Sequence, residues 1–157
     1  MQYTTEPRTK NLTLRDIHVG DWVQVWSPTV ERYSPPMRVS CVNYDGTVYL
    51  VPDDEHYCNP TETEIENVDA LPITADLLKG FGFEVSEMDD DRGTPYQEVE
   101  FKGKYVGALY YYRPDKAYLY TCGYNCLFMH ELIAYNHRNN IDMNLEWKGV
   151  SHEDRID

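Results

Sequence analysis

Residues 96–123 read YQEVEFKGKYVGALYYYRPDKAYLYTCG, and the fold expected for the C-terminal half rests on this stretch. It is rich in tyrosine and valine, residue types that favour β-strands. Gly103 interrupts it once, and RPDK at 113–116 has the residue types of a tight turn. The segments between these breaks alternate in the manner of strands. The stretch therefore predicts a three-stranded antiparallel meander.

Two helices are expected on either side of this meander. CLFMHELIAYNHRN at 126–139 places its apolar residues on one face, as in a helix that packs on a sheet. A shorter helix at 75–81 is predicted from Thr74, a good N-cap residue, and from Gly82, a good terminator. The tail at 143–147, MNLEW, is expected to add an edge strand.

In the N-terminal half of the chain, several short strands predict a small barrel. Residues 21–26 alternate polar and apolar side chains, which is typical of a half-buried strand. MRVSCVNYDGTVYLV at 37–51 indicates a hairpin, because Asp45-Gly46 suits a tight type I′ turn. Residues 65–68 are the expected closing strand. Short strands at this spacing favour an SH3-like or related barrel.

The predicted fold class is therefore α+β, with a small SH3-like β-barrel, a short helix, and an antiparallel meander packed by one C-terminal helix. A length of 157 residues suits one domain or two small lobes. We expect a seam near residues 70–74. The expected segments are a flexible arm at 1–11, the barrel lobe at 12–72, the α+β lobe at 73–150 and a flexible tail at 151–157.

Almost all of the net charge of −13 comes from the middle of the chain. Residues 45–100 hold 16 Asp or Glu but only two basic residues, Lys79 and Arg92. A field of one sign repels nucleic acid and attracts basic protein surfaces or cations. Direct binding to nucleic acid is not expected, since no basic stripe interleaves with the aromatic residues.

No segment approaches the roughly 20 apolar residues that cross a bilayer, and the N-terminus has no signal-like apolar stretch. A cytoplasmic protein without a membrane partner is therefore expected. In that compartment cysteines are free thiols or ligands more often than disulfides. The chain has four of them: Cys41, Cys58, Cys122 and Cys126.

Three segments resemble, in the same order, a family of small uncharacterised proteins from gut Bacteroidetes and their prophages. They are LRDIHVGDWVQVW at 14–26, ENVDALPITADLLKGFGFE at 66–84 and FMHELIAYNHRNNIDMNLEW at 128–147. The last helix departs from the family pattern, because Ile133-Ala134-Tyr135 follows Leu132 where Gln-Asn-Leu-Tyr is usual. The resemblance implies a phage or prophage accessory gene in a bacterial cytoplasm. It implies no activity and no catalytic residues.

The acidic residues are the predicted partner-binding residues. We expect them to engage a host protein with a basic surface, with anti-defence action or mimicry of nucleic acid as variants of that function. The residues are Asp53, Asp54, Glu55, Asp89, Asp90 and Asp91. The chain could also act as an oligomer.

A metal site is the first alternative. Cys122, Cys126 and His130 follow one another at intervals of four residues, and His56 and Cys58 could complete a tetrahedral zinc site. The spacing differs from that of zinc knuckles, so buried thiols are the competing interpretation and no cofactor is the preferred one. A zinc-protease motif is excluded here, because Ala134 stands where the second histidine is needed.

A ligand site is the second alternative. Trp22 and Trp26 share one face of their strand and could form core or an aromatic groove. Arg113, Lys116 and Arg138 would have to converge on a pocket to hold an anionic small molecule such as a nucleotide. The function expected from the sequence is thus a non-enzymatic protein that occupies a partner. The alternatives are a small-molecule or nucleotide sequestering protein and a zinc-binding module or small Cys/His enzyme.

Overall fold

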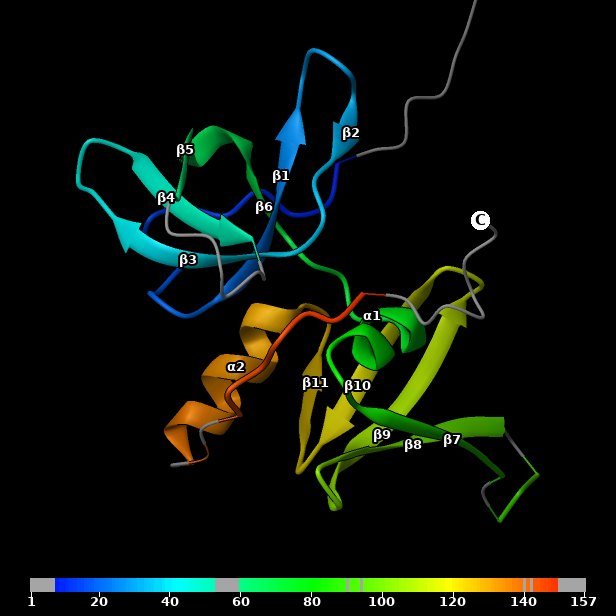
Figure 1. The fold of residues 1–157 in the computed structure, drawn as a ribbon. Helices are drawn as coiled ribbons and strands as arrows, with labels where there is room; N and C mark the ends of the chain where they lie inside the picture. The colour runs from blue at the N-terminus through cyan, green and yellow to red at the C-terminus, as the bar shows by residue number, and fades with distance from the viewer. Residues whose placement is uncertain are drawn as a thin grey trace, which may run out of the picture. The chain divides into compact units, whose positions relative to one another are not determined.

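The structure is a computed structural model that describes residues 8–52, 60–89, 91–93, 95–139, 141 and 143–149. It divides after Leu71 into two compact units. Each unit is built on one antiparallel sheet, and two short helices, α1 (Ala75–Gly80) and α2 (Met129–Arg138), belong to the second unit (Figure 1). The α+β class expected from the sequence is therefore confirmed, with strands dominating.

The first unit is a curled sheet. Its elements are β1 (Trp22–Ser27), β2 (Arg32–Tyr33), β3 (Met37–Val42), β4 (Thr47–Pro52), β5 (Thr61–Glu64), the 3₁₀ helix η1 (Ile65–Asn67) and β6 (Val68–Ala70). The strand order is β2-β1-β3-β4-β5, and β6 also pairs with β1. The sheet curls because β1 has three neighbours along its length. Residues 65–67, expected as strand, form η1 instead.

The predicted hairpin at 37–51 is present as β3 and β4, but its turn is longer than expected. Val42 pairs with Val48, and the backbone N–H of Asn43 donates to the carbonyl of Thr47 at 2.9 Å. Gly46 has a φ of +94°, and Asp45 accepts a hydrogen bond from the N–H of Thr47. The turn thus needs one left-handed residue, which glycine adopts at no steric cost. A two-residue type I′ turn would need two.

Asp69 on β6 is a fully buried carboxylate of the first unit. Its side chain is 0% exposed and forms an ion pair with Arg8. The Tyr33 hydroxyl donates to it at 2.6 Å, and the Asn11 side-chain amide donates at 3.1 Å. Residues 8–11, which the sequence places in a flexible arm, are thus bonded to β6 through this carboxylate. The rest of that arm, residues 1–7, lies outside the described residues.

The second unit is a meander with one more strand at each end than expected. Its strands are β7 (Glu84–Asp89), β8 (Pro95–Phe101), β9 (Lys104–Arg113), β10 (Lys116–Thr121) and β11 (Tyr124–Cys126). They lie in the order β11-β10-β9-β8-β7 (Figure 1). Every strand pairs antiparallel with its neighbour in sequence.

Helix α1 confirms the capping signal in the sequence. The Thr74 hydroxyl accepts a hydrogen bond from the N–H of Leu77 at 3.1 Å, as an N-cap residue does. Gly82, with a φ of +91°, turns the chain into β7.

Helix α2 begins at Met129, three residues later than predicted, because Cys126 belongs to β11. The Glu131 carboxylate accepts hydrogen bonds from the N–H groups of Leu127 and Phe128 and so holds the start of the helix. Neither α1 nor α2, the two α-helices of the described residues, has the length and apolarity that a membrane crossing requires.

The tail at 143–147 does not form the expected edge strand. Trp147 instead packs edge-on against Phe81, with ring centroids 5.0 Å apart, and lies over Gly80 so closely that a Cβ there would overlap its ring. The backbone N–H of Lys148 donates to the Gly80 carbonyl at 2.7 Å. The tail is therefore anchored by one large side chain on α1.

Candidate functional site

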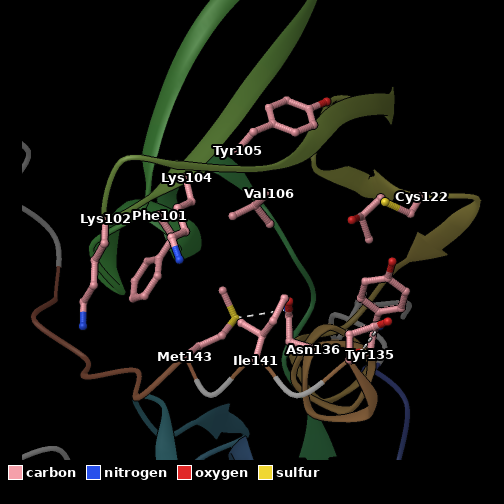
Figure 2. Close-up of a pocket in the computed structure, with 12 residues that line it drawn as sticks. Phe101, Lys102, Lys104, Tyr105, Val106, Cys122, Tyr135, Asn136, Ile141 and Met143 are labelled. Carbon is pink, nitrogen blue, oxygen red and sulfur yellow. Dashed lines mark hydrogen bonds between the residues drawn. The ribbon is translucent and has the colours of Figure 1, made fainter.

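A cavity of about 440 Å³ lies in the second unit, between β-turns of the meander and the end of α2 (Figure 2). The β8–β9 turn forms one end of it and the β10–β11 turn the other. Helix α2 and the segment after it form the remaining wall. The lining residues are Phe101, Lys102, Lys104, Tyr105, Val106, Thr121, Cys122, Tyr135, Asn136, Asn139, Ile141 and Met143.

One end of the cavity is cationic. Lys102 and Gly103 form the two-residue turn, with φ of +51° and +80°, and Lys104 begins β9 directly after it. Lys102 Nζ lies 5.2 Å from the centre of the Phe101 ring. Figure 2 shows both lysines at the Phe101 end of the cavity. Among the described residues neither lysine forms an ion pair.

The opposite end carries a phenol and a thiol. Tyr135 comes from α2, and Cys122 from the β10–β11 turn, where it has a φ of +45°. The hydrogen-bonding interaction with the Cys122 side chain, followed by burial, raises the pKa of Tyr135. Tyr135 is therefore a neutral phenol at pH 7. This end offers hydrogen bonds rather than charge.

The apolar wall of the cavity includes Met143, which a buried amide, that of Asn136, holds in place. The Asn136 side chain donates to the Leu132 carbonyl at 2.9 Å and lies 3.2 Å from the Met143 sulfur. That contact holds the segment after α2 against the helix. Val106 and Ile141 complete the apolar wall, and both point into the cavity in Figure 2.

The other face of the meander carries a row of tyrosines. The rings of Tyr96 and Tyr110 stack with centroids 5.7 Å apart, and those of Tyr110 and Tyr118 stack at 5.5 Å. Tyr112 packs against Tyr118 at 6.3 Å. Alternation along β10 places Tyr120 on the same side. We call these five residues the tyrosine face: Tyr96, Tyr110, Tyr112, Tyr118 and Tyr120.

One glutamate, Glu98, lies beside these rings. Glu98 and Tyr120 both pair with Ala108, so the three form a cross-strand row next to the stacked rings. Burial, and then the charge of Glu98, raise the pKa of Tyr105, which Figure 2 shows on the opposite side of β9 from Val106. The tyrosine face is therefore an aromatic surface with an acidic group inside it.

Of the predicted metal ligands that the structure describes, Cys122, Cys126 and His130 do not form a cluster. Cys122 is exposed at its turn, whereas Cys126 is buried on the side of the meander that α2 packs against. His130 lies on α2. Within the described ranges, no group of three His, Cys, Asp or Glu side chains is arranged to hold a metal ion. His56 and Cys58 lie outside those ranges.

The two cysteines are expected to react very differently with an alkylating reagent. Burial raises the pKa of Cys126 to about 11, so almost no thiolate is present at pH 7.5. Cys122 and Cys41 are exposed. Under native conditions, iodoacetamide should modify Cys122 and Cys41 at least about tenfold faster than Cys126. Peptide mass spectrometry measures the rates, and equal rates at Cys126 and Cys122 would contradict the burial. In denaturant all should react alike.

None of the predicted ligand-binding residues lines the cavity. Trp22 is buried in the first unit. Trp26 is half-buried, packs edge-on against Tyr33 and has the Arg8 guanidinium 5.8 Å from its ring.

In the second unit, Arg113 and Lys116 face each other at the β9–β10 turn, and Arg138 lies over the Tyr124 ring. None of the three lines the cavity, whose cations are Lys102 and Lys104. The sequence signal for these two was Lys-Gly-Lys in a turn, which does not by itself point to a cavity.

Most of the predicted partner-binding residues cannot be placed. Asp53, Asp54, Glu55 and Asp90 lie outside the described residues. Asp89 ends β7 and Asp91 stands in the turn that follows, and both are exposed.

Comparison with protein-family models, with curated proteins and with solved structures finds no match for this chain.

Proposed function

We propose that the chain is a non-enzymatic binding protein that occupies a basic segment of a partner protein with its tyrosine face. The observation that carries this proposal is the run of stacked rings Tyr96–Tyr110–Tyr118 on the meander face opposite the cavity, with Glu98 beside it. The phage or prophage setting implied by the family resemblance fits a protein whose partner belongs to the host.

Tyrosine suits this function physically. It combines a large contact area with a polar tip and loses little conformational entropy on binding. An arginine or lysine that lies over a tyrosine ring gains about 0.5–1 kcal/mol at an exposed site. The rings of Tyr112 and Tyr120 are 53% and 46% exposed, so both are open to such contacts.

Glu98 adds a negative charge to this surface at a defined position. It lies two strands from Tyr120, about 10 Å away at the usual strand spacing, with the small Ala108 between them. A guanidinium stacked on Tyr120 could therefore also reach the Glu98 carboxylate. Charge-assisted hydrogen bonds of this kind are about twice as strong as neutral ones.

The net negative charge of the whole chain also favours a basic partner protein. A net charge of −13 speeds encounter with a basic protein and slows encounter with nucleic acid. Such steering is screened at a Debye length of about 8 Å in physiological salt. Binding is accordingly expected to weaken as salt is raised.

The finer fold of the first unit is part of the proposal. The succession β1, β3, β4, β5, η1, β6, with β6 returning to pair with β1, supports an SH3-like barrel in which β2 is an added hairpin strand. Barrels of this type commonly serve as binding modules.

The proposal predicts binding to an arginine-rich peptide that depends on the tyrosine face. Nona-arginine is the probe, and the same peptide with citrulline, the neutral analogue of arginine, is its control. The variant Tyr112→Ser/Tyr120→Ser should weaken nona-arginine binding about tenfold, because two cation–π contacts are lost. Glu98→Gln should weaken it further. Isothermal titration calorimetry measures each affinity.

The matched variant is Tyr44→Ser, which removes a fully exposed tyrosine from the first unit. It should leave the affinity unchanged. Equal losses in Tyr44→Ser and Tyr112→Ser/Tyr120→Ser, or equal binding of the citrulline peptide, would reject the tyrosine face as the binding surface.

A further inference from the structure

We propose that the cavity of the second unit is a binding site for an apolar organic monocarboxylate. This site lies on the opposite side of β9 from the tyrosine face, so it is independent of the proposed partner function. A carboxylate would meet Lys102 and Lys104, and its apolar body would lie over Val106, Ile141 and Met143.

The size and lining of the cavity support a small organic ligand. A volume of about 440 Å³ falls within the range of about 300–1,000 Å³ that small-molecule sites occupy. Such sites are mostly apolar with a few polar groups that fix orientation. Here the apolar wall is held in place by the contact between Asn136 and Met143.

The two lysines of the cavity favour a ligand that carries its negative charge at one end only. Both cations lie at the Phe101 end, and no ion pair among the described residues neutralises them. Lys102 stands in the two-residue turn and Lys104 begins β9 directly after it, paired with Phe101, so the two lysines stay close together. In a chain of net charge −13, this local excess of positive charge is an exception that favours an anion at this point.

The end of the cavity at Tyr135 and Cys122 limits the charge that the ligand can carry there. Tyr135 offers a neutral phenol and no cation is among the residues that line this end, so a second anionic group there would lack a cation. A dicarboxylate or a nucleoside triphosphate would leave charge without compensation, which is costly in a partly closed site. An aromatic or medium-chain monocarboxylate satisfies both ends.

The test uses 2-naphthoate as the probe and 2-naphthamide as its neutral counterpart. Isothermal titration calorimetry should show that naphthoate binds more tightly than naphthamide. The variant Lys102→Gln/Lys104→Gln should weaken naphthoate about three- to tenfold, the usual range for exposed charge pairs, and leave naphthamide unchanged. Ile141→Trp, which enlarges a side chain of the apolar wall and so fills part of the cavity, should weaken both compounds.

The charge-matched control is Arg113→Gln/Lys116→Gln, which removes two cations from the β9–β10 turn outside the cavity. It should not change either affinity. Thermal melting checks that every variant remains folded.

The proposal is overturned if naphthoate shows no binding up to millimolar concentration. It is also overturned if the two double variants weaken naphthoate equally, or if Tyr112→Ser/Tyr120→Ser abolishes naphthoate binding. Loss of nona-arginine binding in that tyrosine variant concerns the partner function alone, so failure of one proposal is distinguishable from failure of the other.

Discussion

Substitution of Asp69 by alanine is expected to lower the free energy of unfolding by about 2–3 kcal/mol. The Asp69 carboxylate is fully buried and receives hydrogen bonds from Arg8, Tyr33 and Asn11. Its removal leaves the half-buried Tyr33 hydroxyl and the Asn11 amide without this acceptor, whereas the partly exposed Arg8 guanidinium can turn to water. The cost of such unpaired groups is larger than the net gain from the pair itself. Urea denaturation followed by tryptophan fluorescence measures the change.

The control for this prediction is Asp115→Ala, which removes an exposed carboxylate from the β9–β10 turn. It should change stability by less than about 0.5 kcal/mol. A double-mutant cycle with Tyr33→Phe should give a coupling energy of at least about 1 kcal/mol, because the Tyr33 hydroxyl donates directly to Asp69 at 2.6 Å. A loss for Asp69→Ala no greater than that for Asp115→Ala would show that the carboxylate is not buried.

Substitution of Gly107 by alanine is expected to destabilise the second unit by about 3 kcal/mol. A Cβ at this position would lie 2.5 Å from the backbone carbonyl oxygen of Tyr120 and 3.3 Å from Leu119 side-chain atoms. The oxygen belongs to β10 and cannot move without breaking the pairing of β9 and β10. Thermal unfolding measured by circular dichroism reports the loss.

Gly103→Ala separates this clash from a simple loss of glycine. Gly103 has a φ of +80°, and a Cβ there would meet no atom within 4 Å. Its substitution should cost about 1–2 kcal/mol through left-handed backbone strain alone. If Gly107→Ala proved as stable as the wild type, the close approach of β9 and β10 at that residue would be wrong.

Local signals predicted the elements that depend on local chemistry. Thr74 as an N-cap, Gly82 as a terminator and the hairpin around Gly46 are all present, because each needs only a few neighbouring residues. The strand at 37–42 could be recognised for the same reason, since its apolar residues alternate with polar ones.

The strands missed by the sequence include β2 and β5 at the ends of the first sheet's strand order and β7 and β11 at the edges of the meander. Most of β7 is exposed, and its acidic residues resemble a solvated loop when only composition is considered. Charged residues are common on edge strands, where they discourage pairing with other chains. The three residues of β11 are too few to show a period, and Cys126 was therefore assigned to the following helix.

The candidate sites depend on contacts between distant residues, and this is why sequence reasoning did not locate them. Nothing in the sequence separates Asp69 from the other acids of residues 45–100, because its ion-pair partner, Arg8, is 61 residues away. Lys102 and Lys104 become part of a cavity only when the segment after α2 folds over their turn. The tyrosines were noted as abundant, but their stacking requires the register of β8, β9 and β10.

The most direct test of the proposed function is amide chemical-shift mapping of the ¹⁵N-labelled full chain during a titration with nona-arginine. The account predicts that the largest shifts occur on β8, β9 and β10 at the tyrosine face, around Tyr96, Tyr110 and Tyr118, and that they diminish when salt is raised. Shifts confined to the first unit, or spread evenly over every acidic segment without concentration at these tyrosines, would contradict it.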